Sequence, residues 1–390
     1  MRIGLAMDRR GGPSELMLRG IAAYARPARP WVFSWDNPSA EGILRLLELE
    51  PDGLLVKHVD ERGFELIERA GVPTVNLGFP VANSKMRHVG HDESAIGELG
   101  AAYFVSRGYR NFGYYPNTGN PRDLRAHSFR AYLKRYGHTC HVGDAQPAHP
   151  AWPRAQASLK RDNEAICRWL TGLPKPVAVL CAADNFALTV AECCSQLELR
   201  VPDEVAILGV DNDVPVCLLS APPLSSIQIA GERVGYAAAE LLDNLMTPDG
   251  REAPKLVAVP PIRVVSRRST DAVVASDPLV ARALAYLREH ATAPDCLNEF
   301  LATIRCSRRT LERKFRESIG QAPAQAWLRF RLEEATRLLA DTDLSVEHVA
   351  DQSGFGEIRQ LQVAFRKFLH QTPTEFRRHA VPSLRQARAG

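Results

Sequence analysis

Two stretches near the C-terminus share one pattern: a short helical segment, a turn, and a second helix with an apolar seam and a basic side. In the first stretch, about 296–318, the second helix reads SRRTLERKFRES from Ser307, a good N-cap, and its seam is Leu311 and Phe315. At about 100° per residue, the side away from that seam is basic. The arginines that we expect to contact a partner are Arg308, Arg309, Arg313 and Arg316.

The second stretch, 344–369, ends in a helix that reads GEIRQLQVAFRKFL from Gly356 to Leu369. A longer helix from Pro323 to about Ala340 connects the two stretches. Basic sides are common on ordinary surface helices, but a repeated helix pair of this size is typical of helix-turn-helix units that enter the DNA major groove. We expect the seam of the second reading helix at Ile358, Leu361, Phe365 and Phe368. Its DNA-facing residues are expected at Arg359, Gln360, Val363 and Arg366.

This region resembles the DNA-binding domain of the AraC/XylS family of transcription regulators, on SRRTLERKFRESIG, RLEEATRLLADTDLSVEHVADQSGFG and FRKFLHQTPTEFRR. The resemblance covers about the last hundred residues and implies that both recognition helices bind one face of double-stranded DNA, in successive major grooves. Many members carry Ser-Tyr-Phe-Ser in the second recognition helix, where this chain has Arg359-Gln360-Leu361-Gln362. The bases read by that helix therefore cannot be inferred from the family.

From Met1 to about Arg268, short β-rich runs alternate with helical segments, which is the signature of parallel sheets with crossover helices. The span exceeds a usual single core, so we expect two lobes. Crossings between the lobes are expected at the Pro-rich stretches 116–121, 215–223 and 248–254. The predicted strands are 2–7, 31–35, 53–57, 73–77, 111–115, 177–181 and 204–210.

The same region is similar to the sugar-sensing domain of the LacI class, a two-lobed relative of periplasmic binding proteins. The motifs that carry this resemblance are PDGLLVK, AGVPTVNLG, VGHDESAIGELGAAYFVSRGYRNFGYY, CAADNFAL, VPDEVAILGVDND and PPLSSIQIAGERVGYAAAELL. A sensor of this type followed by an AraC-type domain resembles the xylose-operon-regulator (XylR) subfamily. The implied organisation is an effector domain at 1–268, a linker at 269–276, a DNA-binding domain at 277–380 and a tail at 381–390.

That resemblance implies a sugar-responsive transcription regulator of genes for xylose or a related sugar. The expected partners are operator DNA, a sugar effector and a second copy of the chain, with RNA polymerase as a further candidate. The polar, Gly-free segment Val264–Ser276 is expected to pass a sugar-driven movement to the DNA-binding domain. Which sugar is sensed, and whether the chain activates or represses, are left open.

Two carboxylates follow predicted strands where ligands bind in open α/β sheets: Asp184 after VAVLC and Asp211 at the end of EVAILGV. Ionised carboxylates accept hydrogen bonds from sugar hydroxyls. The family resemblance adds Arg125 as a donor clamp, and Asp92 is a further candidate at the same cleft. As alternatives, both strand-end aspartates could cap helices or loops, and Arg125 could only pair with a nearby acid such as Asp123.

Other function classes are disfavoured by the sequence. No signal peptide and no run of 18 apolar residues is present, which favours a cytoplasmic protein over a sugar-transport protein, the main alternative. The run His138–His141 lacks a second ligand pair at zinc-site spacing, so we expect no metal. No nucleophile-base pair or phosphate loop is visible, so we expect neither an enzyme nor a cofactor. The net charge of +4 is too small to indicate DNA binding by itself.

Overall fold

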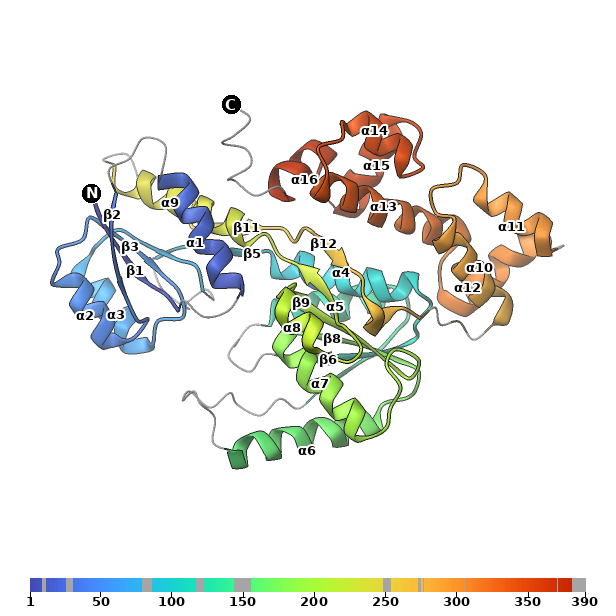
Figure 1. Cartoon of the computed structure of the whole chain (residues 1–390), viewed down its shortest axis with the longest axis horizontal. Coiled ribbons are helices and arrows are strands. Elements are labelled where there is room, and N and C mark those ends of the chain that lie inside the picture. The colour runs from blue at the N-terminus through green and yellow to red at the C-terminus, as the bar shows by residue number, and fades with distance from the viewer. Residues whose placement is uncertain are drawn as a thin grey trace. The chain divides into compact units, whose positions relative to one another are not determined.

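The computed structural model describes residues 1–8, 12–25, 31–78, 86–116, 123–143, 156–247, 254–272, 275, 277–304, 306–369 and 371–380 (Figure 1). These residues form two compact units, Met1–Asp92 with Ile229–Pro261, and Glu93–Gln228 with Ile262–Ala380. Each unit contains one six-stranded sheet, and a helical domain follows within the second unit. The predicted fold class is therefore confirmed.

The chain passes between the units after Asp92, Gln228 and Pro261. The stretch 215–223, which we expected at a crossing, instead lies inside the second unit and contains most of helix α8 (Val214–Leu219). Its proline is in the first turn of that helix, where a missing N–H costs nothing. The other two expected crossings fall largely outside the described residues.

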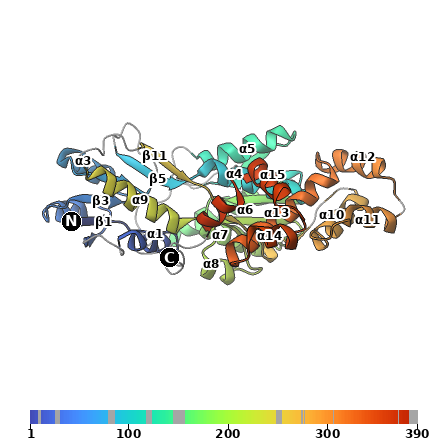
Figure 2. The ribbon, with the colours of Figure 1, turned by 90° about the horizontal axis from the view of Figure 1, so that it is seen from above.

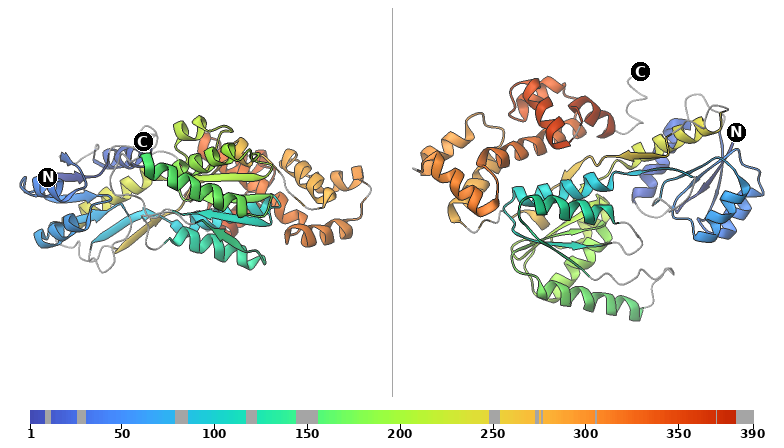
Figure 3. Two further views of the ribbon diagram at one scale, coloured as in Figure 1. Left: turned by 90° about the horizontal axis from the view of Figure 1, so that it is seen from below. Right: turned by 180° about the vertical axis from the view of Figure 1, so that it is seen from behind.

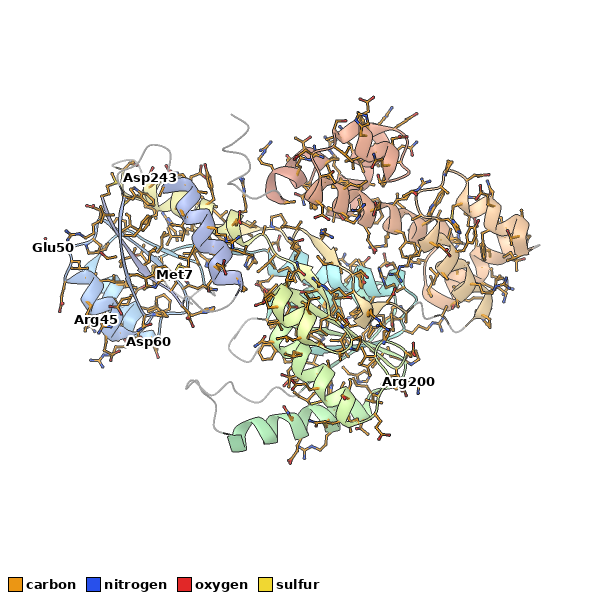
Figure 4. The ribbon with its side chains drawn as sticks, viewed as in Figure 1. Met7, Arg45, Glu50, Asp60, Arg200 and Asp243 are labelled. Carbon is orange, nitrogen blue, oxygen red and sulfur yellow. The ribbon has the colours of Figure 1, made fainter. Side chains whose placement is uncertain are left out.

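In the first unit all strand pairs are parallel, in the order β11-β5-β4-β3-β1-β2. Helices α1 and α9 pack together so closely that a Cβ on Gly235 would lie 1.8 Å from the carbonyl oxygen of Met17. Asp60, labelled in Figure 4, caps α3 by accepting from the Gly63 amide at 2.7 Å. The elements are β1 (Arg2–Ala6), α1 (Gly12–Ala25), β2 (Val32–Asp36), α2 (Ala40–Leu47), β3 (Gly53–Val56), α3 (Glu61–Ala70), β4 (Thr74–Asn76), β5 (Arg87–His91), α9 (Gly231–Leu245) and β11 (Leu256–Val259).

The sheet of the second unit has the order β12-β10-β9-β8-β6-β7, and only the β10–β12 pair is antiparallel. Helices α4 and α5 pack together on one face, and α6 and α7 cover the other (Figures 2 and 3). We call this sheet with its helices the second lobe. Its elements are α4 (Glu93–Ser106), β6 (Asn111–Tyr115), α5 (Leu124–Arg135), β7 (Cys140–Val142), α6 (Gln156–Gly172), β8 (Val177–Cys181), α7 (Asp184–Gln196), β9 (Val205–Asp211), α8, β10 (Ser225–Gln228), β12 (Arg263–Val265) and the 3-10 helix η2 (Arg268–Thr270).

The helical domain is organised around its longest helix, α13 (Pro323–Asp341). One helix group packs at its N-terminal end and a second group at its C-terminal end (Figure 1). The first group is α10 (Pro278–Glu289), α11 (Cys296–Ile304) and α12 (Arg308–Ile319); the second is α14 (Val346–Gln352), α15 (Ile358–Leu369) and α16 (Pro373–Ala380). Within the described residues, no helix is both long and apolar enough to cross a membrane.

Candidate nucleic-acid interface and effector site

Local sequence signals define both ends of α12. The Ser307 hydroxyl accepts from the Thr310 amide at 3.1 Å, as expected of an N-cap, and Gly320 ends the helix in the left-handed conformation with φ 71°. Leu311 and Phe315 are fully buried against α10 and α13. The predicted seam thus fixes which side of α12 faces away from the domain.

All four predicted arginines of α12 are exposed. Arg308 pairs with Glu312 at 3.3 Å, and Arg313 pairs with Glu317 at 2.9 Å, each one turn along the same helix. Arg309 and Arg316 have no ion pair among the described residues. Because exposed ion pairs of this kind are weak, both pairs can open to a phosphate at small cost.

Helix α15, the second predicted recognition helix, exposes all four residues predicted to face DNA: Arg359, Gln360, Val363 and Arg366. One prediction about its seam was wrong, because Ile358 is 37% exposed. This residue is the first of α15 and lies beyond the packed part of the helix. The buried seam consists of Leu361, Ala364 and Phe365, while Phe368 is half-buried with the Arg329 guanidinium 5.0 Å from its ring.

The turn before α15 requires glycine at Gly354, where φ is 80° and an added Cβ would lie 2.6 Å from the Thr292 carbonyl oxygen. Phe355, next in the turn, is buried, so it anchors the start of the reading helix to the domain. The two helix pairs α11–α12 and α14–α15 therefore have the local construction expected of two helix-turn-helix units.

Arg125 lies in the first turn of α5 and is buried. Its Nε and Nη2 donate to Glu93 at 2.9 and 2.8 Å, and its Nη1 donates to the Ala182 carbonyl. Burial works against its charge, but the nearby carboxylates, Glu93 first, raise the pKa of Arg125 overall. Arg125 is therefore a charged donor held in place by an acid that the sequence did not single out.

Asp184 begins α7 and is only 1% exposed. Its carboxylate accepts from the Ser226 hydroxyl at 2.6 Å and from the Asp213 amide at 2.7 Å. Burial raises the pKa of Asp184 to about 6, against the opposing effect of these hydrogen bonds. Its carboxylate is thus engaged by the turn that follows β9 and holds that turn against the start of α7.

Asp211 ends β9 with φ 113°, and Asn212 follows at φ 54°. Such backbone conformations are strained for residues with a side chain and concentrate at binding sites. The Asp211 carboxylate is one of the charges that raise the pKa of Arg125, after that of Glu93, so these two candidates lie in the same part of the second unit. Asp92 belongs to the first unit, where its amide donates to the Val259 carbonyl at 2.8 Å.

Several residues at these strand ends were not anticipated. In the second lobe, Arg267 donates to the Asn212 side chain and to the Leu224 carbonyl, both at 2.8 Å. In the first unit, the buried Lys57 directly follows β3 and donates to the Ser14 hydroxyl at 2.9 Å. The sequence shows a lysine directly after an apolar strand, which is a signal for a polar group at a strand end. No such signal marks Arg267, whose role depends on tertiary contacts.

Comparison with known proteins gives two domain matches and relatives along the whole chain. Residues 101–270 match the periplasmic binding protein-like domain family, and residues 301–379 match a helix-turn-helix domain family. The xylose operon regulatory protein of Escherichia coli (strain K12) is 26% identical over 388 residues, which cover 96% of each chain. Its counterpart in Haemophilus influenzae is 26% identical over 85% of this chain and 86% of that protein.

Solved structures give the same result. The structure of the xylose-binding transcription activator XylR has a TM-score of 0.59 and 25% identity, covering 97% of both chains. The lac repressor dimer bound to operator matches 69% of this chain with a TM-score of 0.53 and 20% identity. This match supports only the fold of the effector domain, which consists of the first unit and the second lobe. Because the relatives are transcriptional regulators and both domain types are present in their order, the chain is an AraC-type helix-turn-helix regulator with a LacI-like, periplasmic-binding-protein-like effector domain.

Proposed function

We propose that the chain binds double-stranded operator DNA in response to a sugar and controls genes for the uptake or catabolism of xylose or a related sugar. The observation that carries this proposal is the pair of exposed basic helix sides, on α12 and α15, within one domain attached to a LacI-like effector fold. The relatives named above, which regulate xylose operons, supply the sugar class. The chain acts by binding alone, in the cytoplasm, without a cofactor.

Base reading is assigned to the exposed residues of α12 and α15. Arg309 and Arg359 are the candidates for bidentate contacts to guanine, and the 59% exposed Val363 for contact with a thymine methyl group. Arg309→Ala and Arg359→Ala should each weaken binding to the DNA upstream of the chain's own operon by about 1–3 kcal/mol, or roughly five- to 150-fold.

Fluorescence anisotropy with that DNA and with a scrambled duplex measures this loss. Arg337→Ala is the matched control, because Arg337 is an exposed arginine of α13 that pairs with Glu334 at 2.6 Å. If both reader variants bind the operator as tightly as the control, the assignment of these helix sides is wrong.

Sugar binding is assigned to the second-lobe strand ends around Arg125 and Asp211, with Asp184 as their support and Asp92 as a candidate from the first unit. A ligand that binds only the folded state stabilises it by RT ln(1 + [L]/Kd), which is about 2.7 kcal/mol at a hundredfold excess over Kd. A thermal-unfolding screen with D-xylose and other pentoses, hexoses and uronic acids should therefore identify the effector. No shift with any sugar would remove the sensor assignment while leaving the DNA assignment intact.

A homodimer is part of the proposal, because linking two DNA-binding modules raises the effective concentration of the second. The first unit offers a surface of the expected kind at its edge strand β2, where Val32 is 65% and Phe33 is 39% exposed. Sedimentation velocity at micromolar concentration tests this part, and a purely monomeric chain on and off DNA would contradict it. Bound to its operator, the dimer would act on transcription by contacting RNA polymerase.

A further inference from the structure

The second lobe holds the long helix of the DNA-binding domain through a partly buried ion pair. Arg107, at the end of α4, is fully buried, and its Nη1 and Nη2 each donate to Glu333 of α13 at 3.0 Å. The Arg107 guanidinium also lies 3.4 Å from the ring centroid of Tyr103, one turn earlier in α4. Because a bidentate pair between charged groups has defined geometry, it fixes α13 in position and direction against α4.

Further contacts fasten the same two bodies, among them one from Arg329 of α13 to the Tyr132 hydroxyl of α5. Arg110 donates to the carbonyls of Glu317 and Ser318, at the C-terminal end of recognition helix α12, where a positive charge is favoured. Gln321, between α12 and α13, donates to the Val105 carbonyl at 3.1 Å, and Arg263 of β12 pairs with Asp341 of α13 at 3.0 Å. The first recognition helix is thus fixed to the second lobe by side chains of that lobe.

The Tyr103 hydroxyl continues this contact into the sheet of the second lobe. It lies 2.7 Å from the Thr270 hydroxyl and 2.8 Å from that of Ser266. The Thr270 hydroxyl in turn lies 2.6 Å from that of Ser225 in β10, and both of these residues are completely buried. The segment that follows β12 is therefore part of the lobe's interior.

The next residue of β10, Ser226, reaches the candidate effector site. Its hydroxyl donates to Asp184 and accepts from the Asn212 amide at 2.9 Å, while Asp184 also accepts from the Asp213 amide. Polar groups thus extend from the turn after β9 to α13, and the step between the neighbouring β10 residues Ser226 and Ser225 is made by their shared backbone. We call this set of groups the buried polar network; its members are Asp184, Ser226, Ser225, Thr270, Tyr103, Arg107 and Glu333.

We propose that the buried polar network is the element through which the turn after β9 and the DNA-binding domain influence each other. The proposal rests on the proposed function for what occupies each end. Buried polar groups that lose a partner pay a desolvation cost, so a change of the turn that displaces Ser226 or Asp184 disfavours the present position of Tyr103, Arg107 and Glu333. A sugar that prefers one conformation of the turn then shifts the position of α12 and α13, and operator DNA shifts sugar affinity by the same factor.

The first test needs neither sugar nor DNA. Tyr103→Phe removes the hydroxyl that joins Thr270 and Ser266 but keeps the ring beneath Arg107, and Glu333→Gln removes the charge at the far end. Tyr109→Phe is the matched control, because the buried Tyr109 hydroxyl has no hydrogen-bond partner in the described part of the chain. Amide hydrogen exchange of the full chain, followed by mass spectrometry, reports local opening.

We expect Tyr103→Phe to accelerate exchange both in the turn at 211–213 and in α13 by about fivefold or more, and Glu333→Gln to do the same. Tyr109→Phe should leave both regions unchanged. The proposal is overturned if each variant changes exchange only beside the substituted residue, or if the control gives the same pattern.

The second test measures coupling. The probe is D-xylose, and the readout is the ratio of operator Kd with and without it. Tyr103→Phe and Glu333→Gln should bring this ratio to within about twofold of unity while each ligand still binds by itself; Tyr109→Phe should keep the native ratio. An unchanged ratio in both network variants refutes the proposal. If D-xylose does not bind the native chain, the proposed effector class fails, and the exchange experiment still decides whether the network joins the two regions.

Discussion

Replacing Asp184 with asparagine should change how the stability of the second lobe depends on pH. Burial raises the pKa of Asp184 to about 6 in the folded chain, above its ordinary value of 3.8. A folded state with the higher pKa binds the proton more tightly than the unfolded state does, so the unfolding free energy falls as pH rises from about 4 to about 6. An asparagine at this position can accept from the Asp213 amide and donate to the Ser226 hydroxyl, and it does not titrate.

The size of the effect follows from the two pKa values. A difference of about two units, at 1.36 kcal/mol per unit, corresponds to about 3 kcal/mol between the fully protonated and the fully ionised forms. At pH 5, one unit below the folded pKa, protonation of Asp184 makes the unfolding free energy of the native chain about 1.4 kcal/mol larger than at pH 8. The unfolding free energy of Asp184→Asn minus that of the native chain should therefore be about 1.4 kcal/mol larger at pH 8 than at pH 5.

Hydrogen exchange of the core amides of β8 and β9 measures the stability of this lobe without assuming that the whole chain unfolds in one step. After correction for the intrinsic pH dependence of exchange, the ratio of protection factors, variant over native, should rise about tenfold from pH 5 to pH 8. Asp203→Asn is the control, because the Asp203 side chain is 68% exposed and makes only a distant pair with Arg200. A pH-independent difference between native chain and Asp184→Asn would show that Asp184 does not titrate in this range.

Three further outcomes are expected. Asp211→Asn should abolish stabilisation by the effector sugar in thermal unfolding while leaving operator affinity without sugar unchanged, because it removes an acceptor charge at the candidate site and not at α12 or α15. Gly97→Ala should lower the melting temperature, at a cost of about 1–3 kcal/mol, because the added methyl group would lie 2.3 Å from the Arg125 carbonyl oxygen. Arg316→Gln should reduce the slope of log Kd against log salt by about 1 if Arg316 contacts a phosphate, as measured by anisotropy titrations at several salt concentrations.

The helix-turn-helix units were predictable because their signals are local. Ser307, the seam of α12 and Pro323 each act within a few residues, and the observed helices α12 and α13 begin and end within two residues of the predicted bounds. Strands β5, β10, β11 and β12 were missed because each is only three to five residues long, and β5, β10 and β12 also include polar side chains. Such segments become strands when neighbouring strands pair with them, which their own composition does not indicate.

The sequence predicted that the candidate effector residues Asp184 and Asp211 stand at strand ends, but not what their side chains contact. The sequence located Asp184 at a strand end, yet its hydrogen-bond partners come from residues 29 and 42 positions away. Likewise, Glu93 is 32 positions from Arg125 and became visible only when α4 packed against α5. Position along the chain indicates which groups stand at strand ends. Which of these groups face a ligand depends on tertiary contacts.

The segment after β12 illustrates this limit and gives a final prediction. Its polar, Gly-free sequence indicated a linker between the two domains. Ser269 and Thr270 are nevertheless fully buried, and Ser269 accepts from the Ser225 amide at 2.8 Å while donating to the Ile207 carbonyl at 2.6 Å. The predicted linker 269–276 thus begins with two residues that belong to the interior of the second lobe. A flexible insertion after Ser269 would separate these groups and should destabilise the lobe.

An insertion of six Gly/Ser residues after Ala272 lies beyond those buried groups and lengthens only the connection to α10. Doubling such a loop costs about 0.6 kcal/mol, so thermal unfolding of the second lobe should stay near that of the native chain. If coupling passes through the buried polar network and the docked helix α13, the effect of D-xylose on operator affinity should survive this insertion. If coupling passes along the connecting backbone instead, the insertion should abolish the effect of D-xylose on operator affinity. That result would show that the docking contacts of α13 do not by themselves transmit the state of the turn after β9.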